Sequence, residues 1–197
     1  MKYQFALYAL LIIASACSRK NENLLSTYIV DESHSVIGWK GAAPDHFHEG
    51  SFSLSGKIHG DSNGNIKDGK FSIPIASIKN FDLPDTIKPQ LLDHLKGQDF
   101  FNIALYPDAG FEIERVTPYD KFSPDTTHII QGVFTMLGKT NTISFPAKIT
   151  FENGSIRTQA GFSIDRLKWG MASFSDPNGE LYIFPEVEIK LDIKATR

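Results

Sequence analysis

From Tyr28 to the C-terminus, apolar and polar residues alternate along most of the chain. Clear examples are HSVIGWKG, GSFSLSGKI, KFSIPIASI, GFEIERV, HIIQGVFTM, GFSIDRL and EVEIKLDI. A period of two, rich in β-branched and aromatic residues, is typical of strands that have two different faces. With turn signals between them, these stretches predict about eight strands, over residues 28–40, 48–59, 66–78, 109–118, 127–138, 141–152, 155–168 and 181–195.

One stretch favours a helix. Residues 88–95 carry Pro89 near their start and are followed by Gly97, which suits the end of a helix. The strands must protect their edges, and closure into a barrel removes edges altogether. The pattern therefore predicts an all-β chain folded as a single eight-stranded antiparallel barrel, without internal repeats or a second domain.

The two faces of the predicted strands differ sharply. One face carries Ser, Thr, Lys and Glu, and the other is rich in Phe and Ile. An eight-stranded barrel is either just filled by its side chains or able to hold one ligand. Periodicity does not separate a filled core from an apolar tunnel, so both alternatives stay open here. The apolar face is formed by Ile37, Trp39, Phe52, Leu54, Phe71, Ile73, Ile75, Phe111, Ile113, Phe134, Met136, Phe162, Ile164, Val187, Ile189 and Leu191.

An apolar run of 12 residues, 5–16, opens the chain. A helix that spans a bilayer needs about 20 residues, so this run is too short. Lys2 precedes the run and the small residues of 14–16 end it, which predicts a signal peptide over residues 1–16.

Cys17, the only cysteine, follows directly. The arrangement resembles the lipobox of bacterial lipoproteins, in which the cysteine sulfur receives a diacylglyceryl group, although Ala14 stands where Leu is commonest. We therefore expect residues 17–27 to form a lipidated N-terminus and tether, and residues 28–197 to form the barrel domain. The alternative is an ordinary signal peptide whose removal leaves a free thiol.

Composition excludes some function classes. The 197 residues are 41% hydrophobic and 22% charged, as in ordinary globular proteins. The net charge is −3, which gives the chain no electrostatic attraction to nucleic acid. A single cysteine allows no internal disulfide.

Three motifs contain residue types used in catalysis or metal binding. His46 and His48 would share a face of a strand and could bind zinc, but no further pair supports them, which favours solvated loop histidines. The DSNGN of 61–65 begins like a calcium loop, but its twelfth position is Ser72, which favours a hairpin turn. Asp31, His34 and Ser35 are triad residue types without a nucleophile-elbow sequence. We expect no catalytic residue, metal or cofactor.

The segment LLDHLKGQDFFNIALYPDAGFEIERV, 91–116, combines a short helix, Asp-Phe-Phe and Tyr-Pro before an alternating strand. It resembles the YceI-like, polyisoprenoid-binding, lipocalin-like family. YIVDESHSVIGWKG, GSFSLSGKI, FSIPIASIKN, IIQGVFTMLGKTNTISFP and GFSIDRLKWGM resemble further strands of that family, in the right order over 28–193. Phe134 replaces a usual Leu, and Leu137 a usual His.

The resemblance implies a lipocalin-like barrel with one or two short helices near one end and an isoprenoid-type lipid inside. Phe100 and Phe101 would cap one end. Asp31, His34 and Arg166 would fix a polar headgroup, or Asp31 and Arg166 would pair to close the barrel. The implied ligand contacts are Ile37, Trp39, Phe52, Leu54, Phe71, Ile73, Phe100, Phe101, Phe111, Ile113, Phe134, Met136, Phe162 and Ile164.

The expected function is storage or carriage of a polyprenyl, quinone or similar lipid by an exported, periplasm-facing lipoprotein of the cell envelope. Ser18 is not the Asp that favours inner-membrane retention in some bacteria, which favours the outer membrane. Members of the resembled family often form homodimers, so a homodimer is a partner to test. The alternatives are an envelope stress or structural protein with a filled core, and an enzyme that acts on an apolar substrate.

Overall fold

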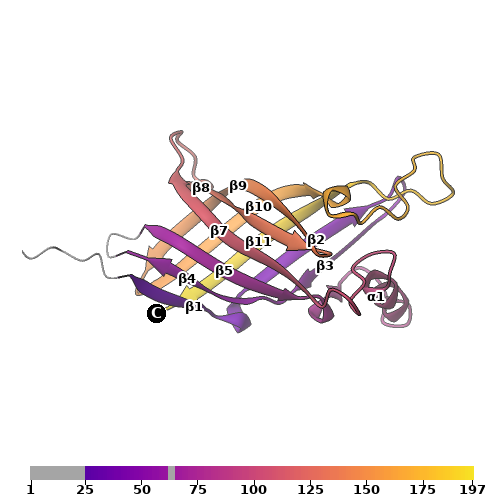
Figure 1. Ribbon diagram of the computed structural model, residues 1–197, viewed down its shortest axis with the longest axis horizontal. Coiled ribbons are helices and arrows are strands. Elements are labelled where there is room, and N and C mark those ends of the chain that lie inside the picture. The colour runs from indigo at the N-terminus through magenta and orange to yellow at the C-terminus, as the bar shows by residue number, and fades with distance from the viewer. Residues whose placement is uncertain (1–24, 62–64) are drawn as a thin grey trace, which may run out of the picture.

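The computed structural model describes residues 25–61 and 65–197 as a long barrel (Figure 1). It contains one α-helix, α1 (Lys88–Lys96), and three 3-10 turns, η1 (Glu32–His34), η2 (Ile75–Ser77) and η3 (Arg166–Trp169), among the residues described. The predicted signal peptide, Cys17 and most of the tether lie outside the described residues. The strands are β1 (Ser26–Val30), β2 (Val36–Ala42), β3 (Phe47–Phe52), β4 (Ser55–Gly60), β5 (Ile66–Pro74), β6 (Lys79–Asn80), β7 (Asp108–Pro118), β8 (His128–Met136), β9 (Lys139–Glu152), β10 (Ser155–Asp165) and β11 (Glu186–Thr196).

Eight strands close the barrel. Their order is β1-β4-β5-β7-β8-β9-β10-β11, and β11 pairs back to β1. Every pairing is antiparallel, and the connections β8–β9 and β9–β10 are two-residue turns. The ring confirms the predicted eight-stranded antiparallel barrel, because each of its strands pairs with two neighbours over at least part of its length.

Three predicted strands are broken in two. β2 continues the line of β1 along β11, β3 continues the line of β4, and β6 extends the line of β5 beside β3. The eleven segments thus follow the eight predicted strands, with interruptions inside 28–40, 48–59 and 66–78. The predicted strand end at 168 is corrected to 165, the end of β10, because Asp165 caps η3 by accepting a hydrogen bond from the Leu167 amide. The predicted strand start at 181 is corrected to 186, the start of β11, because the carbonyls of Ile183 and Phe184 bind Arg166 instead of a ladder.

Side-chain hydrogen bonds cause the first interruption. Asp31 accepts a hydrogen bond from the Ser33 amide at 3.2 Å, which bends the backbone into η1. The Ser35 hydroxyl then accepts from the Lys194 amide at 2.9 Å and donates to the Lys194 carbonyl at 3.1 Å. This hydroxyl replaces main-chain partners of the ladder, which is how short polar side chains compete with sheet structure.

Beyond the second interruption, β4 lies unusually close to β5. A Cβ on Gly56 would lie 2.4 Å from the Lys70 carbonyl oxygen, and the φ of Gly56 is +156°. Only glycine fits this approach. Between the two pieces, Leu54 points into the barrel and is 2% exposed.

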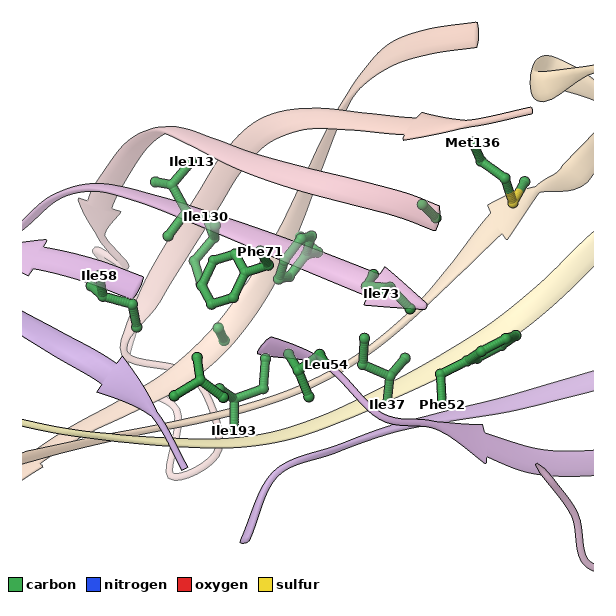
Figure 2. Packing of buried hydrophobic residues seen from close by; sticks show 14 of the residues in the cluster. Ile37, Phe52, Leu54, Ile58, Phe71, Ile73, Ile113, Ile130, Met136 and Ile193 are labelled. Carbon is green, nitrogen blue, oxygen red and sulfur yellow. The ribbon is translucent and has the colours of Figure 1, made fainter. Parts of the chain in front are cut away.

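The interior is filled at one end. Ala147, Ile156 and Ala195 are almost completely buried where β9, β10 and β11 meet near the C-terminus. Further along, Ile113 of β7 and Ile193 of β11, which lie four strands apart in the ring, point inward from opposite walls (Figure 2).

The opposite end of the barrel is its mouth. α1 and the loop that follows η3 lie there, far from the C-terminus (Figure 1). The predicted helix at 88–95 is confirmed, and it contacts the core through the partly buried Leu92 and Leu95. No helix among residues 25–61 and 65–197 is long and apolar enough to cross a bilayer.

Candidate functional site

An apolar cavity of about 120 Å³ lies inside the barrel. Thr158 is the one polar residue in its lining. We call it the inner cavity. Twelve of the fourteen expected ligand contacts line it: Ile37, Phe52, Leu54, Phe71, Ile73, Phe101, Phe111, Ile113, Phe134, Met136, Phe162 and Ile164.

Ile143 and Phe145 of β9 also line the inner cavity but were not among the expected contacts. Both follow the same alternation as the expected residues, so the signal was present in TISFPAKIT. The inner cavity equals only about four water volumes, at roughly 30 Å³ each. A long chain would therefore have to displace lining side chains to enter it fully.

A second cavity of about 630 Å³ occupies the mouth. We call it the outer cavity. It is lined by the turn between β2 and β3, by α1 and by the loop 171–183, and it includes the two remaining expected residues, Trp39 and Phe100. This volume lies within the range of about 300–1,000 Å³ that ligand pockets occupy.

A constriction separates the two cavities. Phe52, Phe101 and Met136 line both of them, together with Ile164 and Ile189. The rings of Phe52 and Phe101 meet edge to face, with centroids 5.6 Å apart. Phe101 therefore lies across the passage, as a cap would. Phe100 lies apart from it and stacks on Phe174 with centroids 6.0 Å apart.

Arg166 is buried in the wall of the outer cavity, with 2% of its surface exposed. Its Nε donates to the Phe184 carbonyl at 3.3 Å, and its Nη1 and Nη2 donate to four more carbonyls. Those carbonyls belong to Met171, Ser173, Phe174 and Ile183.

A guanidinium has five N–H donors, so these five contacts leave none for a headgroup. Burial lowers the pKa of Arg166, although Asp165 and Tyr182 act in the opposite direction. Within the described residues no carboxylate pairs with this guanidinium, and the expected ion pair with Asp31 does not form. The reason is that main-chain carbonyls of the loop already surround Arg166, which acts as a clamp on the mouth.

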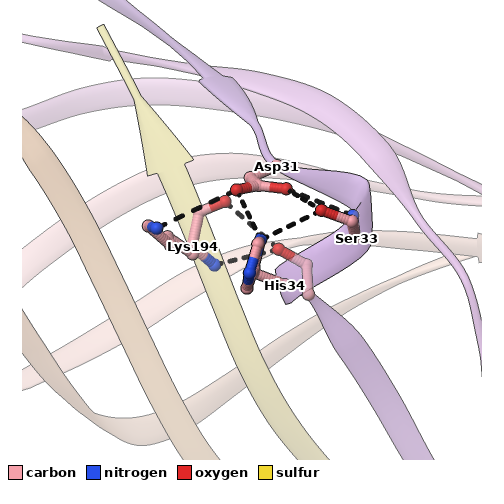
Figure 3. Close-up of polar contacts among 5 residues, drawn as sticks. Asp31, Ser33, His34 and Lys194 are labelled. Atoms are coloured by element: carbon pink, nitrogen blue, oxygen red, sulfur yellow. Dashed lines mark hydrogen bonds and ion pairs between the residues drawn. The ribbon is translucent and has the colours of Figure 1, made fainter.

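Asp31 and His34 lie on the outside of the barrel (Figure 3). His34 Nδ1 is 2.8 Å from an Asp31 carboxylate oxygen, and Lys194 Nζ is 3.9 Å from the same oxygen. The Ser33 hydroxyl has the largest effect on Asp31 and holds its pKa below the ordinary value, and His34 and Lys194 act in the same direction. Neither Asp31 nor His34 lines a cavity. Their role is structural but differs from the expected ion pair, because they form a turn that interrupts the strand.

His46 and His48 both line the outer cavity. His46 is an exposed loop histidine, as expected, whereas His48 lies within β3 and is partly buried, which corrects the expectation for that residue. Each ring is fixed through Nδ1, His46 by Asp45 at 2.7 Å and His48 by Asp82 at 2.7 Å. Burial is the largest influence on Asp82 and raises its pKa, but hydrogen bonds led by the Glu49 amide bring the pKa below its ordinary value. No group of three potential metal ligands occurs among the residues described.

The comparisons with known proteins agree with this geometry. A family model described as the YceI-like domain matches residues 28–195. No curated protein matches the chain.

Three solved structures are similar over most of the barrel. BcnA of Burkholderia cenocepacia has a TM-score of 0.69 and 22% identity, covering 85% of this chain and 99% of that one. A polyisoprenoid binding domain from Saccharophagus degradans has a TM-score of 0.62 and 13% identity, covering 86% and 97%. The YCEI protein of Campylobacter jejuni has a TM-score of 0.58 and 20% identity, covering 80% and 84%. At these identities the likeness shows the fold.

Proposed function

The chain belongs to the YceI-like family, and we propose that it binds a long apolar lipid of the isoprenoid type, such as a polyprenyl or quinone chain, inside its barrel. The observation that carries the proposal is the hydrocarbon-lined inner cavity, which adjoins a larger and more polar outer cavity. The similar domain from Saccharophagus degradans, described as binding polyisoprenoid, supports the choice of ligand.

The energetics favour carriage or storage over tight capture. A chain of about 40 carbons would release roughly 30 kcal/mol on transfer from water at about 0.8 kcal/mol per methylene. Non-covalent affinities stop near 18–21 kcal/mol, so water is the wrong reference state. The bilayer competes for the ligand and solvates the chain about as well as Phe and Ile do. Net affinity is then small, which suits reversible exchange with a membrane.

The outer cavity would hold the polar end of the ligand. A neutral histidine that donates through Nδ1 to a carboxylate keeps Nε2 as a hydrogen-bond acceptor. The Nδ1 atoms of His46 and His48 contact carboxylates at the cavity wall, so in the neutral form each ring would offer Nε2 as an acceptor. A hydroxyl-bearing headgroup fits these acceptors better than an anion, since Arg166 has no donor to spare.

Export and anchoring complete the proposal. Residues 1–16 would direct export, and Cys17 would carry several acyl chains, which anchor stably where a single chain does not. The protein would face the periplasm from the outer membrane. Mass spectrometry of the native N-terminus, together with a C17S variant that should lose membrane association, tests this part. Light scattering during gel filtration tests the expected homodimer.

An envelope protein with a filled core is the second candidate, and the close packing around Ile156 and Ala195 favours it at one end of the barrel. An enzyme has less support, because Asp31 and His34 lie outside both cavities and Arg166 bonds only to carbonyls. We therefore propose a binding protein without catalytic activity.

The proposal is tested by transfer of a labelled polyprenol from phosphatidylcholine vesicles to the purified protein. Ala109 lines the inner cavity, so A109L should reduce uptake by filling it. Ala104 is exposed, so A104L is the matched control and should bind like the original chain. Equal uptake by both variants, or none by the original chain, would refute lipid binding in the barrel.

A further inference from the structure

β9 and β10 are paired over only part of their length. β9 has 14 residues and β10 has 11, yet their register runs only from Glu152–Ser155 to Lys148–Gln159. Beyond that point, β9 pairs with β8 alone and β10 with β11 alone. The ring of hydrogen bonds is therefore interrupted between β9 and β10 on the mouth side, while each strand keeps its other neighbour.

The sequence explains where the pairing stops. Continuing the register would place Pro146 opposite Gly161, two residues beyond the Lys148–Gln159 pair. Proline has no N–H to donate to a ladder, and glycine offers no side chain to pack across it. We call the unpaired stretch between 142–146 and 161–165 the β9–β10 seam.

Two aromatic side chains close the seam from inside. The rings of Phe145 and Phe162 stack with centroids 4.2 Å apart and an interplanar angle of 10°. Both residues line the inner cavity. Side chains, whose rotamers can change, therefore separate the cavity from the outside here, in place of a hydrogen-bonded backbone.

Both ends of the seam are fixed. At the mouth end, Asn141 donates to the Lys168 carbonyl at 3.2 Å, and Trp169 donates to the Phe134 carbonyl at 3.0 Å. At the other end, the ladder resumes at Lys148–Gln159. The seam is thus a bounded slot, and opening it requires no loss of the strands on either side.

Apart from Asp165 at the mouth end, whose carboxylate accepts a hydrogen bond from the Leu167 amide, the outer surface of the seam is uncharged. Its exposed residues on β9 are Thr142, Ser144 and Pro146, and those on β10 are Gly161 and Ser163. The neighbouring strand β11 instead presents Glu186, Glu188 and Lys190 on its outer face. An apolar chain that leaves a bilayer meets fewer charges to desolvate at the seam than along β11.

We propose that the β9–β10 seam is a lateral portal through which the apolar chain of the ligand enters and leaves the inner cavity, and this rests on the proposed function. The portal bypasses the constriction where Phe52 and Phe101 meet. The Phe145–Phe162 stack is its gate, and the outer cavity then receives only the polar end of the ligand.

The test closes the seam chemically. In the full chain carrying C17S, the pair S144C/S163C is joined by a cleavable bis-maleimide. The pair S163C/E188C is the matched control, because Ser163 and Glu188 face each other in a continuous ladder. Transfer of a labelled polyprenol between protein and phosphatidylcholine vesicles is then followed in both directions.

We expect the seam cross-link to slow transfer about tenfold, because closing a path raises a barrier. The final distribution of the probe should not change, and cleavage of the linker should restore the rate. The control cross-link should leave the rate within about twofold. Unchanged transfer through a fully cross-linked seam would overturn the portal and leave lipid binding intact. An original chain that takes up no probe would overturn both proposals.

A second pair of variants avoids cross-linking. F162L removes one ring of the gate, and F71L removes a ring elsewhere in the inner cavity that stacks on Phe111. We expect F162L to accelerate transfer several-fold and F71L to leave it unchanged or slower. Acceleration by F71L as large as that by F162L would count against a gate at the seam.

Discussion

Replacing Arg166 should loosen the mouth of the barrel without unfolding its far end. One guanidinium joins five carbonyls of the segment 171–184, and it is 2% exposed. R166M keeps the length and apolar stem of the side chain but removes every donor. R166K keeps the charge with three donors in place of five.

The expected cost is smaller than a sum over five hydrogen bonds. Each hydrogen bond to a charged group contributes about 1.5–3 kcal/mol, but burial of the guanidinium opposes this gain. Carbonyls released at the mouth also regain water. We expect R166M to lose about 3 kcal/mol of unfolding free energy, within the range for breaking a buried charged contact. R166K should lose roughly two-thirds as much, since at least two carbonyls lose a partner.

Urea unfolding gives the global loss, and hydrogen exchange locates it. Amides of 171–184 should lose far more protection in R166M than those around Ile156, whose protection should fall only by the global loss. R157M is the control, because Arg157 bonds bidentately to Asp192 on the exposed surface and its loss should matter far less. Retained protection of 171–184 in R166M, or equal destabilisation by both variants, would show that the clamp argument is wrong.

Three further predictions concern other parts of the barrel. G56A should lose about 1–3 kcal/mol of stability by urea unfolding, because its Cβ meets the Lys70 carbonyl, whereas G161A, whose Cβ meets nothing within 4 Å, should be nearly neutral. Native-state hydrogen exchange should be faster at the Ser163 amide in the seam than at the Arg157 amide in the ladder, and equal protection would contradict the loss of pairing. The pKa of Asp82 is below its ordinary value of 3.8 in the folded chain, so its contribution is fully present above that value and is lost as pH falls through the folded pKa. The stability difference between the original chain and D82N, about 1 kcal/mol at neutral pH, should therefore shrink below pH 4 in urea titrations, and a constant difference would contradict it.

Alternation along the chain was enough to predict the barrel, because each strand needed only its own period of two. The interruptions were not predictable, because they depend on distant partners. Ser35 looks like one more polar position in a strand, but its hydroxyl bonds to Lys194, 159 residues away. Which main-chain groups a serine can reach is decided only after the sheet has assembled.

The candidate site shows the same division between what the local pattern predicts and what depends on distant partners. The apolar lining followed from periodicity, and Phe145 was within reach of the same reasoning. The role of Arg166 was not predictable, because its partners are main-chain carbonyls. Every residue has such a carbonyl, so the sequence does not indicate which ones Arg166 binds. The barrel is filled near Ala195 and contains an apolar cavity further along, and a periodic pattern describes both parts identically.

The place where the chain enters the barrel bears on which surface can meet a membrane. β1 begins at the end opposite α1 (Figure 1). From Ser26 to Ala42 the chain runs the length of the barrel, about 40 Å along the axis once strand tilt is included. Residues 17–25 span at most about 30 Å when fully extended. A barrel anchored through Cys17 would therefore not turn its mouth onto the same bilayer, whereas the end where β1 begins and the flank beside it stay within reach. The ring order β9-β10-β11-β1 puts the seam two strands from the tether, so the stretch where side chains alone close the inner cavity lies near the anchored side of the barrel.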